Sequence, residues 1–135
     1  MKQYQYILID REPVEASMDV WVNWMQTCPK DRLLAKAFYR HPKNDDNIGP
    51  YVDIEVSTVF LTCDHSFGGK GGPVLFETMT FGMEEEGEDW QNGFWGNNMT
   101  HYHTYDEAMD GHRLSVAVVE LFLEKLRESD TELKS

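Results

Sequence analysis

The stretch from residue 56 to residue 81 constrains the fold more than any other part of the chain. It contains two runs rich in β-branched and aromatic residues, 56–63 and 74–81. A connector at residues 64–73, rich in glycine and ending in proline, separates them. Two strand-like runs joined in this way predict an antiparallel hairpin. The rest of the chain must therefore supply partners for that hairpin.

The connector carries four side chains suited to ligand binding, namely Asp64, His65, Ser66 and Lys70. Glycines let a backbone approach a ligand closely and can present N–H groups to an anion, to which Lys70 would add positive charge. The spacing differs from a phosphate-binding P-loop, because Lys70 is followed by Gly71 and a strand rather than by Ser or Thr and a helix. We therefore interpret residues 64–73 as a site for a small anion, with a mobile hairpin tip as the alternative.

The composition predicts one domain with one core. A chain of 135 residues with 41% hydrophobic residues is large enough to bury most of its apolar surface. The first residues lack the apolar region of a signal peptide and no run is long enough to span a bilayer, so we expect a cytoplasmic protein without membrane contact. Cys28 and Cys63 lack the spacing of a zinc site or redox pair, which predicts two buried thiols. We expect no cofactor.

The charge of the chain restricts the class of partner. With 24 acidic and 12 basic residues the net charge is −12. Contacts to nucleic-acid phosphates need clustered Lys and Arg, so we expect no direct binding to nucleic acid. An acidic surface instead suits a basic protein partner, although such a charge also serves simply to keep a protein in solution.

Hydrophobic periodicity and breakers assign the elements. Strands are predicted at residues 4–10, 32–40, 51–63 and 74–81, helices at 15–27 and 104–128, loops at 41–50 and 83–100, and a frayed tail at 129–135. This order predicts a single α+β domain, 1–135. We expect a mainly antiparallel sheet of four or five strands with two packed helices, the longer one C-terminal.

A histidine and a carboxylate are predicted to face the core. Thr104 and Glu107 form a capping box, and the helix that follows places His112 on its apolar face. Strand alternation places Glu77 on the same face of residues 74–81 as Leu75, Met79 and Phe81. Glu77 and His112 are therefore expected to approach one another, either as a ligand-binding pair or as a structural pair that satisfies its own polar groups.

Two further groups of residues are candidates for binding. The loop at 83–100 passes from acidic residues to Trp90, Phe94 and Trp95, which form either a flap on the domain or a patch that binds a partner. The candidate metal ligands are Asp64, His65, His101, His103 and His112. They match no familiar metal-binding signature, so we expect no metal site.

Short sequence motifs lie at residues 57–61, 64–68, 75–79 and 102–108 and at Gly111-His112. In this order they resemble a group of short bacteriophage and prophage proteins whose function is unassigned. The resemblance implies a phage accessory protein that acts in the cytoplasm of a bacterial host, and it implies no catalytic role for any residue.

These observations lead to three hypotheses of function. The first is a non-enzymatic protein that binds a small anionic ligand, such as a nucleotide signal of host defence, through the loop at 64–73 with Glu77 and His112 nearby. The second is an acidic inhibitor of a host protein, for example a nucleic-acid-binding effector. The third is a small hydrolase that uses His65 or His112. No catalytic residue is assigned, and the oligomeric state stays open.

Overall fold

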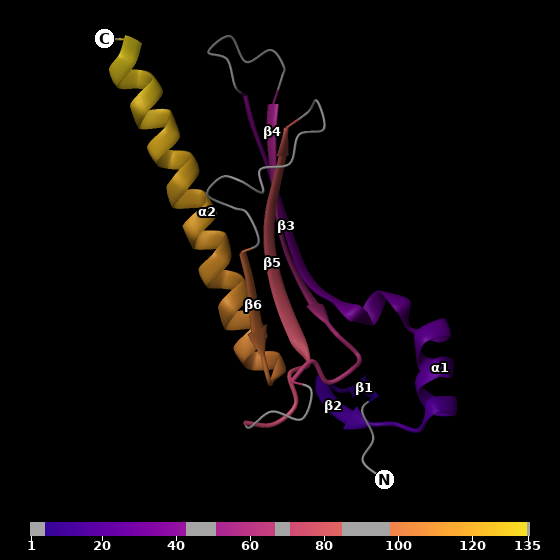
Figure 1. Cartoon of the computed structure of the whole chain (residues 1–135). Helices are drawn as coiled ribbons and strands as arrows, with labels where there is room; N and C mark the ends of the chain where they lie inside the picture. Colours follow the sequence, from indigo (N-terminus) through magenta and orange to yellow (C-terminus); the bar gives the residue numbers. More distant parts are fainter. Residues whose placement is uncertain (1–4, 43–50, 67–70, 85–97, 135) are drawn as a thin grey trace.

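The computed structural model describes residues 5–42, 51–66, 71–84 and 98–134, and it shows an α+β fold (Figure 1). The elements are β1 (Tyr6–Ile9), β2 (Glu12–Glu15), α1 (Met18–Thr27), the 3-10 helix η1 (Pro29–Arg32), β3 (Leu33–Pro42), β4 (Tyr51–Phe60), β5 (Phe76–Glu84), β6 (Asn98–Tyr102) and α2 (Tyr105–Lys134). The predicted fold class is confirmed, with the longer helix at the C-terminal end.

The central sheet has four antiparallel strands in the order β3-β4-β5-β6. The predicted hairpin is its centre, because β4 pairs with β5 from Val52 opposite Glu84 to Phe60 opposite Phe76. β6 begins at Asn98, inside the stretch that we predicted as a loop, and α2 continues beyond its predicted end at residue 128. Figure 1 shows α2 running along one face of this sheet.

A second, two-stranded sheet was not expected. No strand was predicted at residues 12–14, and residue 15 was predicted to begin a helix, but residues 12–15 form β2, which pairs with β1. The helix α1 instead begins at Met18, after Ser17 accepts a hydrogen bond from the backbone N–H of Val20 at 3.4 Å. The helix ends before Pro29, which cannot continue it. In Figure 1 the small sheet and α1 lie at the lower end of the central sheet.

The face of β5 that packs on α2 is the opposite of the one predicted. Phe76, Thr78 and Thr80 are buried, whereas Glu77 and Met79 point to the other side of the sheet and are half-buried. The reason lies in β4, whose Ile54, Val56 and Phe60 occupy the covered face. The hydropathy of β5 alone therefore gave the wrong face, because its neighbouring strand decides the matter.

Two clusters of buried hydrophobic residues fill the structure. The lower core cluster contains Tyr6, Ile7, Ala16, Trp24, Phe60, Leu75, Phe76 and Ala108. The upper core cluster contains Ile54, Val56, Val119 and Leu123, between the sheet and α2. Cys28 and Cys63, which we predicted as buried, are half-buried free thiols. The lower core cluster brings the β1–β2 hairpin next to the start of α2, and this arrangement positions the site described below.

Candidate functional site

The turn between β1 and β2 has an unusual backbone. Asp10 and Arg11 connect the two strands with φ angles of 50° and 69°. Tight hairpin turns favour Asn-Gly or Asp-Gly at these positions, because a side chain in the left-handed region is strained. Arg11 occupies the position at which glycine is favoured. Strain of this kind is concentrated at functional sites, so the turn is a candidate for function.

The Arg11 guanidinium lies over the ring of Tyr105, with its central carbon 5.4 Å from the ring centroid. Tyr105 is the first residue of α2, and its ring lies perpendicular to that of Phe76 in the lower core cluster, with the ring centroids 6.2 Å apart. Among the described residues, no carboxylate lies within salt-bridge distance of Arg11. The arginine is therefore held by a cation–π contact and keeps its charge available.

Among the described residues, three hollows open around this pair, and both Arg11 and Tyr105 line each of them. The first hollow has a volume of about 280 Å³ and is lined by Leu8, Asp10, Arg11, Lys30, Asp31, Leu33, Leu34 and Tyr105. The other two have volumes of about 440 Å³ and about 350 Å³. The second is lined by two aspartates and two arginines, of which Asp110 and Arg113 pair with one another, and the third is acidic, with Asp10, Glu12 and Asp106 against Arg11 alone. The first hollow balances its two aspartates with Arg11 and Lys30 and adds three leucines, so it is the better place for an anion with an apolar part.

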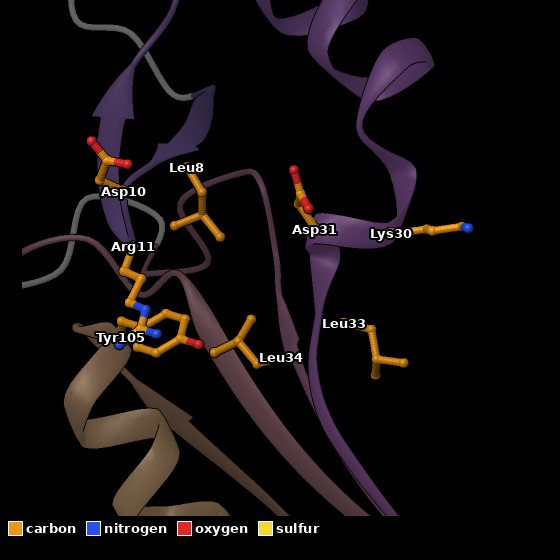
Figure 2. Close-up of a pocket in the computed structure, with 8 residues that line it drawn as sticks. All are labelled: Leu8, Asp10, Arg11, Lys30, Asp31, Leu33, Leu34 and Tyr105. Carbon is orange, nitrogen blue, oxygen red and sulfur yellow. The ribbon is translucent and has the colours of Figure 1, made fainter.

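Figure 2 shows how the side chains of the first hollow are directed. Leu8, Leu34 and the Tyr105 ring form an apolar wall beside the Arg11 guanidinium. The ammonium group of Lys30 points away from Arg11, and so do the carboxylates of Asp10 and Asp31. A ligand in this hollow would meet one cation and an apolar surface, which is the combination expected of a small-molecule site.

The predicted site at residues 64–73 has a different organisation from the one expected. The Asp64 carboxylate is buried, and its Oδ1 accepts hydrogen bonds from the backbone N–H groups of Ser66 at 2.8 Å and Val74 at 3.0 Å. The Asp64 carboxylate therefore links the start of the loop to the residue that follows its end. His65 is exposed and donates its backbone N–H to the Val74 carbonyl. Lys70 lies outside the described residues, so its role in binding stays a prediction.

The predicted proximity of Glu77 and His112 is wrong. Glu77 lies on the face of the sheet opposite α2, which we call the uncovered face with respect to that helix, and its Oε2 is 3.1 Å from Nε2 of His101. His112 does face the sheet, as predicted, but on the side that α2 covers. Its Nδ1 is 2.8 Å from the hydroxyl of Thr58, which is 2.6 Å from the hydroxyl of Thr78. The two residues occupy opposite faces because of the alternation in β5 described above.

The electrostatics of His112 favour a neutral ring. Burial lowers its pKa below the ordinary value, and the nearby Arg113 charge lowers it further. Together with Thr58 and Thr78, the imidazole lies between the lower and the upper core cluster. Its most evident role is therefore structural. Its assignment to a ligand site stays a prediction.

The other candidate groups are dispersed. His103 makes a hydrogen bond with the Pro73 carbonyl at 2.8 Å. This contact is separate from the one between His101 and Glu77. Within the described residues, no three His, Cys, Asp or Glu side chains are grouped so that they could hold a metal ion. Trp90, Phe94 and Trp95, predicted to bind a partner, lie outside the described residues.

Sequence reasoning missed Arg11 and Tyr105. The turn itself was visible in the polar residues that follow residue 9, and Tyr105 follows the predicted helix cap at Thr104. Neither signal reveals that the two side chains meet, because they lie at opposite ends of the sequence. Only the packing of the β1–β2 hairpin on the lower core cluster brings them together.

Two further observations complete the description of the chain. No helix among the described residues is both long and apolar enough to cross a membrane. Comparison of the chain with protein-family models, with curated proteins and with solved structures gave no match.

Proposed function

We propose that this protein is a non-enzymatic binder of a small anionic ligand, and that the ligand occupies the first hollow with its charged group on Arg11. The observation that carries the proposal is the position of the Arg11 guanidinium. A strained turn holds it against Tyr105, it borders all three hollows, and it has no ion-pair partner among the described residues.

The chemistry of the lining supports recognition rather than catalysis. Arginine stays protonated in proteins and cannot act as a general base, but its planar group suits carboxylates and phosphates. Leu8 and Leu34 add an apolar surface beside it. The ligand is therefore an anion that also carries an apolar or aromatic part, and the volume of about 280 Å³ restricts it to a small molecule.

A nucleotide combines an aromatic base with phosphate and is the first class to test. The resemblance to bacteriophage proteins implies an accessory protein in the bacterial cytoplasm. A nucleotide signal of host defence is a ligand that such a protein would meet there. Inorganic phosphate and an uncharged nucleoside separate the two parts of the requirement, because the first supplies only the charge and the second only the aromatic part.

Isothermal titration calorimetry against these compounds tests the proposal. We expect one nucleotide to bind, and Arg11→Ala to weaken it about 10-fold to 100-fold, since a hydrogen bond to a charged group contributes roughly 1.5–3 kcal/mol. Arg127→Ala, which removes an exposed arginine from α2, is the matched control and should bind as the wild type does. No heat with any compound, or unchanged binding by Arg11→Ala, would contradict the proposal.

Lys70→Ala distinguishes this site from the loop at residues 64–73. If Lys70→Ala abolishes binding while Arg11→Ala does not, the ligand binds at the loop, as the sequence first suggested. If only Arg11→Ala has an effect, the first hollow is the site.

A second candidate function is that of an acidic inhibitor that binds a basic host protein. The uncovered face of the sheet favours it, because Leu33, Phe38 and Met99 are exposed there and Phe38 is 57% accessible. Capture from a bacterial lysate with wild-type protein and with Phe38→Asp tests this function. A basic protein that the wild type retains and Phe38→Asp releases would support it, while equal capture by both would exclude this face.

A further inference from the structure

The outer face of α2 carries a second apolar stripe. Leu114, Val118 and Leu121 are 68%, 39% and 54% exposed, and their spacing of four and three residues places them in one row. Ala117, also exposed, lies beside this row. The inner face of the helix, with Ala108, Val119 and Leu123, is already buried against the sheet. The stripe therefore belongs to neither core cluster.

No described element lies over this stripe. Figure 1 shows α2 along the outside of the molecule, with the sheet on one side of it only. Three large aliphatic side chains in one exposed row are unusual on a helix whose other outward positions are mostly charged. The stripe has the pattern of a helix seam, in which apolar residues alternate between spacings of three and four.

Opposite charges lie at the two ends of the stripe. Seven residues before Leu114 the same row contains Glu107, and four residues after Leu121 it contains Lys125. Both side chains are exposed, and neither forms a salt bridge with another described residue. The row is thus negative at its N-terminal end, apolar at its centre and positive at its C-terminal end.

We propose that this stripe is a homodimer interface, in which α2 of one copy packs antiparallel against α2 of a second copy. An antiparallel arrangement centred between Leu114 and Val118 places each Leu114 against Val118 of the second copy. In the same register, Glu107 lies opposite Lys125 of the second copy at both ends. Two salt bridges then flank the apolar centre.

The charges select the direction of the pairing. A parallel pair would place Glu107 against Glu107 and Lys125 against Lys125, which is unfavourable at both ends. Antiparallel helices also place opposite ends of their dipoles together. Ala117, a small residue, lies next to the symmetry axis and allows the helices to approach closely.

The predicted dimer is weak and depends on concentration. The row from Glu107 to Lys125 is about 27 Å long at the helical rise. One helix pair of this length buries less than the roughly 800 Å² per partner of a standard stable interface. The net charge of −12 on each copy also opposes association.

Sedimentation of the full chain from low micromolar to near-millimolar concentration tests the proposal. The average mass should rise from 15.7 kDa toward twice that value. Leu114→Asp and Leu121→Asp should each keep the protein monomeric, whereas Phe38→Asp, on the uncovered sheet face, should dimerise normally. Circular dichroism checks that each variant is folded, which we expect because the changed positions are exposed.

Charge reversal tests the antiparallel register. Glu107→Lys and Lys125→Glu should each weaken the dimer several-fold, and the double variant should restore it to near the wild-type strength. A wild type that stays monomeric at the highest concentration would overturn the proposal. So would a dimer that survives Leu114→Asp, or a double variant that is weaker than both single variants.

Discussion

The Nδ1 atom of His112 lies 2.8 Å from the hydroxyl oxygen of Thr58, in the middle of the interface between α2 and the sheet. Thr78 extends this contact to a network of three buried polar side chains. Hydrophobic clusters lie on either side of it. A buried network of this kind specifies how the helix is placed on the sheet, because sliding α2 in either direction would leave polar groups without partners.

Thr58→Val should therefore destabilise the fold. The substitution keeps the shape of the side chain but removes both hydrogen bonds, so we expect a loss of about 1–3 kcal/mol in the free energy of unfolding. Urea denaturation measures the change. Thr100→Val, at an exposed position of β6, is the matched control and should have little effect. Equal stabilities of the two variants would show that the network contributes nothing.

The buried imidazole predicts a dependence of stability on pH. Because burial and Arg113 hold the pKa of His112 below 6.5, the unfolded chain binds this proton more readily than the folded chain. The contribution of His112 to stability is present above pH 6.5 and is lost as the pH falls from 6.5 toward the lower folded-state pKa. The free energy of unfolding should therefore fall between about pH 7.5 and 5.5. His112→Gln should reduce this fall, and an unchanged pH profile would contradict the assignment.

Gly111 should not tolerate a methyl group, although it lies inside a helix. Glycine-to-alanine changes within helices usually stabilise a protein by about 1 kcal/mol. Here the added Cβ would collide with the hydroxyl end of the Tyr102 ring, so Gly111→Ala should lower the melting temperature instead. In a Tyr102→Leu background the same change should be less harmful. Stabilisation by Gly111→Ala in the wild-type background would show that Tyr102 moves away without cost.

The strained turn predicts a conflict between stability and binding at Arg11. Arg11→Gly relieves the left-handed conformation at φ 69°, whereas Arg11→Ala keeps it, and both remove the guanidinium. The glycine variant should be more stable than the alanine variant by about 1–2 kcal/mol. Both variants should bind the ligand about 10-fold to 100-fold more weakly than the wild type. Thermal denaturation compares them, and equal stabilities would argue against strain at this turn.

The two tryptophans of α1 should respond differently to substitution by phenylalanine. Trp24 is buried, with its ring perpendicular to that of Phe60 and the ring centroids 5.7 Å apart, so Trp24→Phe should leave a cavity and destabilise the lower core cluster. The indole N–H of Trp21 is buried without a hydrogen-bond partner among the described residues. Trp21→Phe removes this unsatisfied donor, so its cost in urea denaturation should be smaller. A larger cost for Trp21→Phe would contradict this reasoning.

Sequence reasoning recovered the elements whose signals are local. The hairpin of β4 and β5 follows from β-branched runs on either side of a glycine-rich connector. α2 follows from its cap and apolar periodicity, and Thr104 does accept a hydrogen bond from the backbone N–H of Glu107 at 3.1 Å. The inward direction of His112 follows from the same periodicity. β6 escaped prediction because five residues beside a polar, glycine-rich segment carry too little pattern.

The sequence by itself determined that an α+β domain would form, that its centre would be one hairpin and that a long helix would turn His112 inward. Tertiary structure alone decided which face of β5 that helix covers, and so separated Glu77 from His112 and joined the histidine to Thr58. It also brought Arg11 to Tyr105. The physical reason is the same in each case: alternation and helical spacing fix directions along one element, whereas contacts between distant elements depend on how their apolar faces pack together.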